Sequence, residues 1–147
     1  MSRQPANPSR LTRVLFVCVG NACRSQMAEG FARAYGSDVL DVMSAGLAPA
    51  VCIPPDTVRA MLEKNIDLGG HFPKSWRHLA GREFDLVVNM SGRELPPGVA
   101  APQRVWNVPD PYLLEYAEMC RVRDQIELYV MSLILELRRA AKRGARR

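Results

Sequence analysis

Short runs of apolar residues, separated by helical patterns, constrain the fold of this chain more than any other feature. The three strongest runs are TRVLFVC (12–18), FDLVVNM (84–90) and QRVWNV (103–108), and a weaker one is DVLDVMS (38–44). Continuous apolar runs of this length suit strands of a parallel sheet that is covered on both faces. The sequence therefore predicts four parallel strands.

Helical periodicity fills the segments between and after these runs. Met27, Phe31 and Tyr35 recur at intervals of four residues after Arg24. A second apolar stripe follows the prolines at 54–55, and a third lies near the end of the chain. We expect the members of both stripes to be core residues. They are Val58, Met61, Leu62 and Ile66, and then Met119, Val122, Ile126, Tyr129, Leu133 and Leu137. Strands that alternate with helices predict an α/β fold: a three-layer, doubly wound, four-stranded parallel sheet with helices on both faces.

Positive charge is concentrated at the end of the chain. The net charge is +5, but the last ten residues hold six of the 20 Lys and Arg, so no basic face for specific nucleic-acid binding is predicted. We expect a flexible polar arm at 1–11, a single domain at 12–140 and a basic tail at 141–147. The sequence has no apolar run of about 18 residues and no apolar segment behind its N-terminal charges, which predicts no membrane span and a cytoplasmic location.

The four cysteines are Cys18, Cys23, Cys52 and Cys120, and no two of them form a C-x-x-C pair. The two histidines are not spaced to complete a zinc site with them. We therefore expect free thiols, of which some fill the core or one reacts, and no bound metal.

The segment CVGNACR (18–24) joins the first predicted strand to the first predicted helix. Ligands in doubly wound sheets bind beyond the carboxyl ends of the strands, which is where Cys18 lies. Gly20 and Asn21 tolerate left-handed backbone angles, so the loop can point successive N–H groups at one anion.

Arg24 opens the predicted helix, whose positive end adds to such an anion site. Its guanidinium group suits bidentate binding of an oxyanion. A thiolate at Cys18 would face the bound anion in attack position, and Ser25 could donate a hydrogen bond to the sulfur. These features together predict a reactive cysteine.

Asp110 follows another predicted strand and is therefore expected at the same edge of the sheet. Pro111 favours an extended backbone at Asp110. The carboxyl group is a candidate general acid, and an ordinary Asp-Pro turn is the alternative. Tyr112 is expected either to line the substrate mouth or to cap the following helix.

The loop CVGNACRS (18–25) resembles the phosphate loop of the low-molecular-weight protein tyrosine phosphatases, C-x-G-N-x-C-R-S. The resemblance covers residues 12 to 137 and is very specific. Its other motifs are SAG (44–46), PPD (54–56), IDLGGH (66–71), VPDPY (108–112) and RDQIE (123–127).

This resemblance implies a role for each matching residue. Cys18 would be the nucleophile that forms a cysteinyl-phosphate intermediate, and Asp110 would be the general acid and then the base. The phosphoryl oxygens would be bound by Arg24 and by the backbone of Val19, Gly20, Asn21, Ala22, Cys23, Arg24 and Ser25. A supporting hydrogen-bond network would contain Asn21, Ser25, Ser44 and His71. No metal or other cofactor is needed, because the thiolate, the arginine and the backbone dipoles handle the charge.

The same fold and loop also serve thioredoxin-coupled arsenate reductases, in which further cysteines resolve an arsenate adduct. The continuation RSQMAE (24–29) is similar to the reductases, whereas the phosphatases commonly continue R-S-P. However, the segment 89–103 lacks the cysteine pair that a disulfide relay needs. The D-P-Y sequence at Asp110 is also more similar to the phosphatases than to the D-D-P form of the reductases. In this family Cys23 is a protective or redox-sensing partner of Cys18, and we expect Cys52 and Cys120 to pack in the core.

We therefore expect metal-independent hydrolysis of phosphotyrosine or aryl phosphate monoesters. The substrate would be a phosphotyrosine protein or a small aryl phosphate, and phosphate, sulfate and arsenate would bind the loop. The alternative is an arsenate reductase that uses Cys18 with an external thiol, such as glutaredoxin or a small thiol. A second alternative is an oxyanion-binding redox regulator.

Overall fold

The computed structural model describes residues 10–79, 81–99 and 101–145. Four strands pair in parallel to form one sheet with the order β2-β1-β3-β4. The strands are β1 (Thr12–Cys18), β2 (Leu40–Gly46), β3 (Leu86–Asn89) and β4 (Gln103–Val105). The predicted α/β class and the four-stranded parallel sheet are confirmed.

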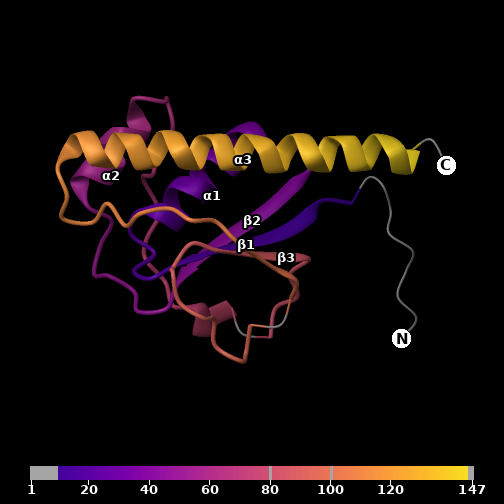
Figure 1. Ribbon diagram of the computed structural model, residues 1–147, viewed down its shortest axis with the longest axis horizontal. Helices are drawn as coiled ribbons and strands as arrows, with labels where there is room; N and C mark the ends of the chain where they lie inside the picture. The colour runs from indigo at the N-terminus through magenta and orange to yellow at the C-terminus, as the bar shows by residue number, and fades with distance from the viewer. Residues whose placement is uncertain (1–9, 80, 100, 146–147) are drawn as a thin grey trace.

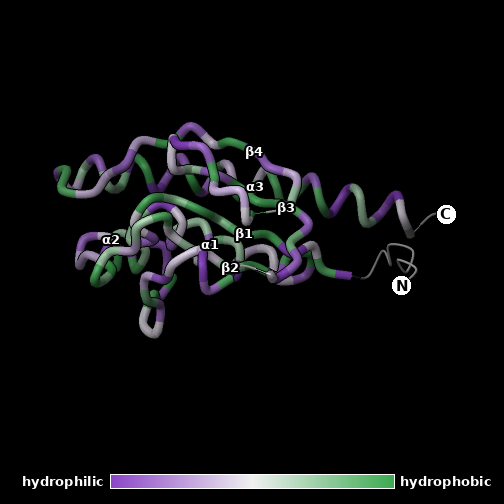
Figure 2. The backbone as a smooth tube through the Cα atoms, turned by 90° about the horizontal axis from the view of Figure 1, so that it is seen from below, coloured by the Kyte–Doolittle hydropathy of each residue, from purple (hydrophilic) through white to green (hydrophobic). Residues whose placement is uncertain are grey.

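Three α-helices cover one face of the sheet, and a short 3₁₀ helix with its neighbouring loops covers the other (Figure 1). The helices are α1 (Arg24–Tyr35), α2 (Pro55–Leu62), α3 (Tyr116–Ala145) and the 3₁₀ helix η1 (Trp76–Leu79). Alternate residues of β1 enter the two cores: Val14 and Phe16 face the α-helices, whereas Leu15 and Val17 face η1. The strands are correspondingly rich in hydrophobic residues, drawn green in Figure 2. The three layers of a doubly wound sheet are therefore present.

Three of the four strands differ from their predicted bounds. The predicted strand 38–44 lies two residues later, 84–90 shortens at both ends, and 103–108 ends at Val105. Trp106 and Val108 are buried as expected although they lie beyond the end of β4, and the Trp106 N–H still donates to the carbonyl oxygen of Asn89 at 3.1 Å. The indole ring of Trp106 stacks on Tyr129, with ring centroids 4.9 Å apart. The paired residues Gln103–Val105 are themselves exposed, so burial along this run does not mark the extent of the strand.

One residue of the predicted helical core is misplaced. Leu62, at the end of α2, is exposed, whereas Met61 beside it is fully buried. The helix stops before Ile66, which is still buried against α1. The final turn of α2 therefore presents one apolar side chain to solvent.

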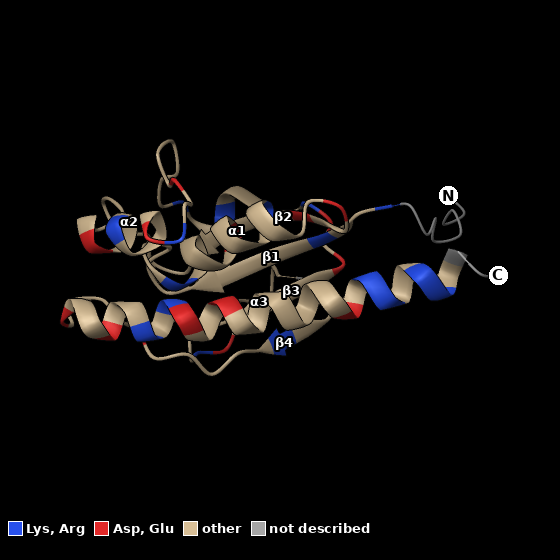
Figure 3. Cartoon of the chain, turned by 90° about the horizontal axis from the view of Figure 1, so that it is seen from above, with Lys and Arg blue, Asp and Glu red and all other residues tan. Residues whose placement is uncertain are grey.

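Helix α3 extends beyond the sheet, and Figure 3 shows blue Lys and Arg residues on its projecting end. Arg138 is held by Asp38 at 2.8 Å, and the helix continues to Ala145 through residues predicted as a basic tail. At the other terminus, Arg10 pairs with Asp85 at 2.9 Å. The rest of the predicted arm (1–9) and the last two residues lie outside the described residues. Within the described part of the chain, no helix combines the length and apolar character that a membrane crossing requires.

Candidate active site

The loop between β1 and α1 forms the candidate anion site. Cys18 ends β1 and Arg24 begins α1, and the residues between them are buried or half-buried. Asn21 adopts a left-handed backbone with φ 49°, while Gly20 does not. No side chain caps the start of α1, so its first N–H groups are free to face a bound anion. The local fold thus matches the predicted phosphate-binding loop.

A pocket of about 280 Å³ opens above this loop. Asp110 and Tyr112 from the segment after β4, and Ala48 and Ala50 from the segment after β2, complete its wall. The full lining is Cys18, Val19, Gly20, Ala22, Cys23, Arg24, Ala48, Ala50, Asp110 and Tyr112. The structure therefore brings all three predicted catalytic residues into one pocket.

The segment after β2 supports the loop through its backbone. The N–H groups of Leu47, Ala48 and Ala50 donate to the carbonyl oxygens of residues 18, 19 and 20 at 3.1, 2.8 and 2.9 Å. At Gly46, an added Cβ would lie only 2.7 Å from the carbonyl oxygen of Val19 and 2.8 Å from the nitrogen of Asn21. The SAG motif thus allows two backbone segments to approach closely, a role that the sequence alone did not reveal.

A network of side-chain hydrogen bonds runs from Cys18 into the protein. The sulfur of Cys18 lies 2.9 Å from Ser25 Oγ, and Asn21 Nδ2 donates to Ser25 Oγ at 2.7 Å and to Ser44 Oγ at 2.9 Å. Ser44 Oγ then donates to Glu29 Oε1 at 2.7 Å. The side chains of this hydrogen-bond network are buried, and their burial fixes the orientation of Asn21 and Ser25 beneath the loop.

Gln26 connects His71 to this network. Gln26 Nε2 donates to Asn21 Oδ1 at 3.0 Å, and Gln26 Oε1 lies 2.9 Å from His71 Nδ1. His71 also lies 3.3 Å from Glu29 Oε2. Burial lowers the pKa of His71 below its usual value, although Glu29 opposes this shift. His71 therefore reaches the predicted network through Gln26 and Glu29.

Lys74 adds a cation behind the loop. Its backbone N–H donates to Asn21 Oδ1 at 3.0 Å, and its ammonium group lies 4.0 Å from Glu29 Oε1. Burial lowers the pKa of Lys74. Sequence reasoning missed Gln26, Glu29 and Lys74. The signal for the first two was their polar character within α1, whose first nine residues are all buried.

Arg24 ties three segments together below the pocket. Its Nη1 donates to the carbonyl oxygens of Met90 at 2.5 Å and Val108 at 3.2 Å, and its Nη2 lies 3.5 Å from Asp110 Oδ2. Its Nε is buried and has no hydrogen-bond partner in the described part of the chain. A buried donor without a partner is costly, so this atom is poised for an oxyanion oxygen.

Asp110 lies at the mouth of the pocket with half of its side chain exposed. Its Oδ1 accepts a hydrogen bond from the Tyr112 N–H at 3.1 Å, and Pro111 between them is buried. Tyr112 lines the pocket, whereas α3 begins only at Tyr116. Of the two predicted positions for Tyr112, the structure places it at the mouth.

The other three thiols occupy different environments. Cys23 is buried and accepts a hydrogen bond from Thr57 Oγ1 at 3.3 Å, and burial raises its pKa to about 11. Cys120 is half-buried, with its sulfur 3.7 Å from Glu63. Cys52 is exposed, so its predicted place in the core is wrong. It follows the loop-supporting segment, which lies at the molecular surface.

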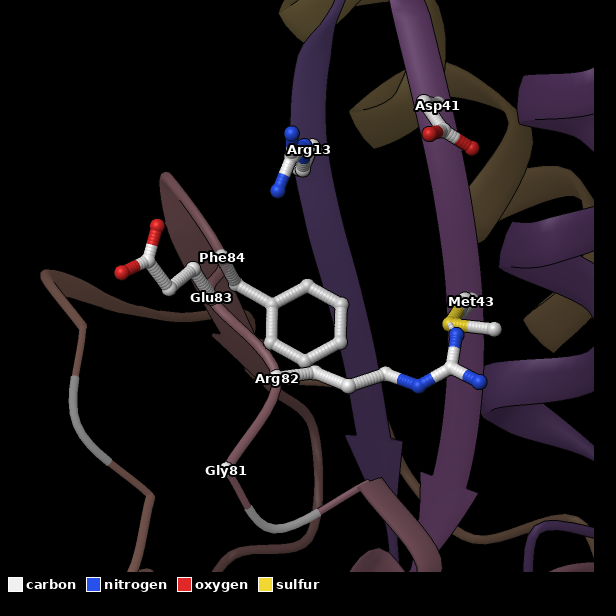
Figure 4. A pocket seen from close by; sticks show the side chains of 7 residues that line it. All are labelled: Arg13, Asp41, Met43, Gly81, Arg82, Glu83 and Phe84. Atoms are coloured by element: carbon white, nitrogen blue, oxygen red, sulfur yellow. Dashed lines mark hydrogen bonds between the residues drawn. The ribbon is translucent and has the colours of Figure 1, made fainter.

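A larger pocket of about 620 Å³ lies on the η1 face of the sheet, at the opposite end of β1 from Cys18 (Figure 4). Arg82 extends across it toward Met43, whose sulfur lies 3.4 Å from the guanidinium group. Arg13, Asp41 and Phe84 also line it, but no cysteine does. This pocket therefore does not share the chemistry of the pocket that contains Cys18.

Comparison with known proteins identifies the family. Residues 13–97 match the family model described as low molecular weight phosphotyrosine protein phosphatase. An arsenate reductase of Staphylococcus xylosus is 35% identical over 123 residues, covering 80% of this chain and 92% of that protein. A glutaredoxin arsenate reductase of Synechocystis sp. is 31% identical and covers 86% of this chain and 99% of its own length.

Solved structures agree with this assignment. An arsenate reductase in the phosphate binding state is 31% identical, has a TM-score of 0.77, and covers 86% of this chain and 99% of its own. The tyrosine phosphatase Wzb of Escherichia coli K30, in complex with sulphate, has a TM-score of 0.74 at 22% identity, over 87% of this chain and 99% of its own. That likeness shows the fold alone. The protein therefore belongs to the low-molecular-weight phosphotyrosine protein phosphatase family, which also contains the arsenate reductases.

Proposed function

We propose that this protein is an arsenate reductase that uses Cys18 as its nucleophile and takes its electrons from an external thiol. The observation that carries the proposal is the position of Cys18 in the pocket with Arg24, whose buried Nε has no partner among the described residues. The sequence favoured a phosphatase, but the named relatives above 30% identity are arsenate reductases. They support the alternative better than the first hypothesis.

In the first step, the Cys18 thiolate attacks arsenic in bound arsenate. A sulfur–arsenic bond forms and an arsenic–oxygen bond breaks, and the oxygen leaves as water after protonation. Loop N–H groups and Arg24 hold the remaining oxygens and offset their negative charge. Asp110, 3.5 Å from Arg24, is the group at the mouth that can deliver the proton.

In the second step, a thiolate attacks the sulfur of Cys18. A disulfide forms, the sulfur–arsenic electron pair passes to arsenic, and arsenite leaves. The segment 89–103 holds no cysteine, and Cys23 is buried with a pKa of about 11, so it is a poor attacking thiol at neutral pH. In this proposal two external thiols supply the two electrons: the first forms the disulfide with Cys18, and the second attacks that disulfide and releases Cys18 as a thiolate.

Hydrolysis of aryl phosphates is the second candidate function, and the position of Asp110 favours it. A half-exposed carboxyl group above the loop can protonate the leaving oxygen and then activate water. Arsenate and phosphate are both tetrahedral oxyanions, so the loop can bind either. The two activities differ in the reactant that resolves the cysteinyl adduct, which is water for the phosphatase and a thiol for the reductase.

The test compares both activities in the wild type, Cys18→Ser and Asp110→Asn, without added metal. For a reductase, we expect arsenate-dependent oxidation of dithiothreitol that is lost in Cys18→Ser, with feeble hydrolysis of p-nitrophenyl phosphate. Strong hydrolysis that falls about 10²-fold in Asp110→Asn, with no arsenate-dependent thiol oxidation, would instead establish the phosphatase.

A further inference from the structure

We propose that the pocket on the η1 face of the sheet is a binding site for a small aromatic anion. This inference goes beyond the proposed function and does not depend on it, because the pocket and Cys18 lie at opposite ends of β1. The pocket holds about 620 Å³, which is enough for a ring system with a charged substituent.

The alternation of side chains along β1 and β2 builds one wall of the pocket. Arg13 pairs with Asp41, and two residues further along both strands Leu15 pairs with Met43. Leu15 and Met43 pack in the core on the η1 face, so Arg13 and Asp41 lie on the same face of the sheet. Both charged residues are exposed. The wall therefore changes from apolar at Met43 to charged at Arg13.

Phe84 supplies an aromatic surface within the pocket. It packs against the core on the η1 face and also lines the pocket. Figure 4 shows its ring face-on, between Arg13 and the side chain of Arg82. A ring face of this kind attracts a second ring by stacking and covers apolar surface of a ligand. The ring therefore favours an aromatic ligand.

Arg13 and Arg82 flank this ring, and neither guanidinium group has an anionic partner in the described part of the chain. Arg82 Nη1 lies 3.4 Å from the sulfur of Met43, which is a weak hydrogen-bond acceptor. The backbone N–H of Arg13 donates to Asp85 Oδ2 at 2.8 Å, but the Asp85 carboxylate is paired with Arg10. Both flanking guanidinium groups are therefore available to an anion of the ligand.

The carboxylates that line the pocket are turned away from the ring. In Figure 4, Glu83 points outward from the segment 81–84, and Asp41 points away from β1. The lining thus contains two cations and two anions, but only the cations are directed along the ring. We infer that the ligand lays its own ring on Phe84 and directs its anionic group to Arg13 or Arg82.

The test uses 2-naphthoate as the probe and follows its binding to the full chain by fluorescence anisotropy. A carboxylate is chosen because a tetrahedral phosphate would also bind the Cys18 loop. We expect saturable binding of 2-naphthoate. We also expect about 10-fold weaker binding of 2-naphthalenemethanol, which carries the same ring without the charge.

Two variants separate the contributions of charge and ring. Arg82→Gln removes the charge, and Phe84→Leu removes the ring but keeps an apolar side chain. We expect each to weaken the binding of 2-naphthoate about 10-fold. Arg139→Gln is the matched control, because it removes one exposed positive charge on α3, outside the lining of the pocket, and should leave the affinity unchanged. Circular dichroism would check that Phe84→Leu, which also alters the core, is folded.

Methionine methyl resonances locate the bound probe. Met43 lines the pocket, whereas Met27 and Met61 are fully buried in the core on the other face of the sheet. We expect the ring current of bound 2-naphthoate to shift the Met43 methyl resonance and to leave the resonances of Met27 and Met61 in place.

Three outcomes would overturn the proposed site. The first is the absence of saturable binding up to about 1 mM probe. The second is an unchanged affinity in Arg82→Gln or in Phe84→Leu. The third is binding that leaves the Met43 resonance in place, which would put the probe elsewhere on the protein, as at the Cys18 loop.

Discussion

Gly46 determines the shape of the catalytic loop although it contributes no side chain. An added Cβ would meet three backbone atoms of the loop within 2.9 Å, and none of them can move without moving the loop itself. Flexible side chains relax away from such contacts, but hydrogen-bonded backbone does not. A methyl group at this position therefore changes the anion site directly.

We expect Gly46→Ala to lower kcat/KM at least 10-fold and to weaken phosphate binding, while the chain still folds. Gly69→Ala is the control, because there the added Cβ would meet a flexible carboxylate, Asp67, at 3.0 Å. Isothermal titration with phosphate and circular dichroism would separate the two effects. Full phosphate affinity in Gly46→Ala would show that the loop yields to the methyl group.

Cys23 is a buried thiol with a raised pKa. Because burial raises its pKa to about 11, we expect Cys23 to resist iodoacetamide at pH 8, while exposed Cys52 is alkylated rapidly. Peptide mass spectrometry over a time course would give both rates. In urea the two rates should converge, and equal rates in the folded protein would contradict the burial of Cys23.

The residues that could be predicted at the site are those whose chemistry is visible in the local sequence. Cys18, Arg24 and Asp110 follow strands or open a helix, so a strand pattern alone brings them to one edge. Glu29 and Lys74 could not be placed in this way, because the contact between them and the contact of Lys74 with Asn21 depend on how the segment 69–75 folds against β2. Such a contact between distant segments leaves no periodic trace in the sequence.

At the scale of elements, α3 offers a matched pair of apolar residues. Ile126 is fully buried against the sheet, whereas Leu128, two residues later, points to solvent. We expect Ile126→Ala to lower the free energy of unfolding by about 2–5 kcal/mol. Leu128→Ala should change it by less than about 0.5 kcal/mol.

Urea unfolding of both variants at one pH would measure this difference. A large loss in Leu128→Ala would mean that this face of α3 is covered in solution. A small loss in Ile126→Ala would mean that the core beneath α3 relaxes around the cavity.

The presence of each strand could be predicted from the sequence, but its first and last residues could not. At β4 pairing and burial do not coincide: Gln103–Val105 pairs with β3 but is exposed, whereas Trp106, beyond the assigned strand, is buried and packs on Tyr129. Bounds of β2 moved because Gly46, which is not apolar, extends its pairing with β1. A pattern of hydrophobicity reports which residues are covered but not which backbone groups are paired.

At the scale of the whole molecule, His71 makes stability depend on pH. Burial lowers its pKa from 6.5 in the folded protein, although Glu29 and Asp67 oppose the shift and Arg33 and Lys74 reinforce it. The unfolded chain therefore binds a proton more readily than the folded one. The free energy of unfolding should fall as the pH drops below about 6.5, and the stability is fully present above that value.

Urea unfolding between pH 7.5 and 5.5 would test this dependence. We expect a shallower slope in His71→Asn, whose side chain does not titrate. Carboxyl groups with a lowered pKa, such as that of Glu63, titrate at lower pH and therefore do not change the slope between pH 5.5 and 7.5. Identical slopes in the wild type and His71→Asn would contradict the assignment.

In the proposed function the loop holds its ligand with backbone N–H groups and one guanidinium group, and this limits which anions it can distinguish. Binding by such donors depends on the charge and the tetrahedral shape of an anion, and phosphate and arsenate share both. Phosphate would then compete with arsenate for the pocket. Selectivity for arsenate over phosphate would have to arise after binding, in the reduction step, because arsenic accepts an electron pair there and phosphorus does not.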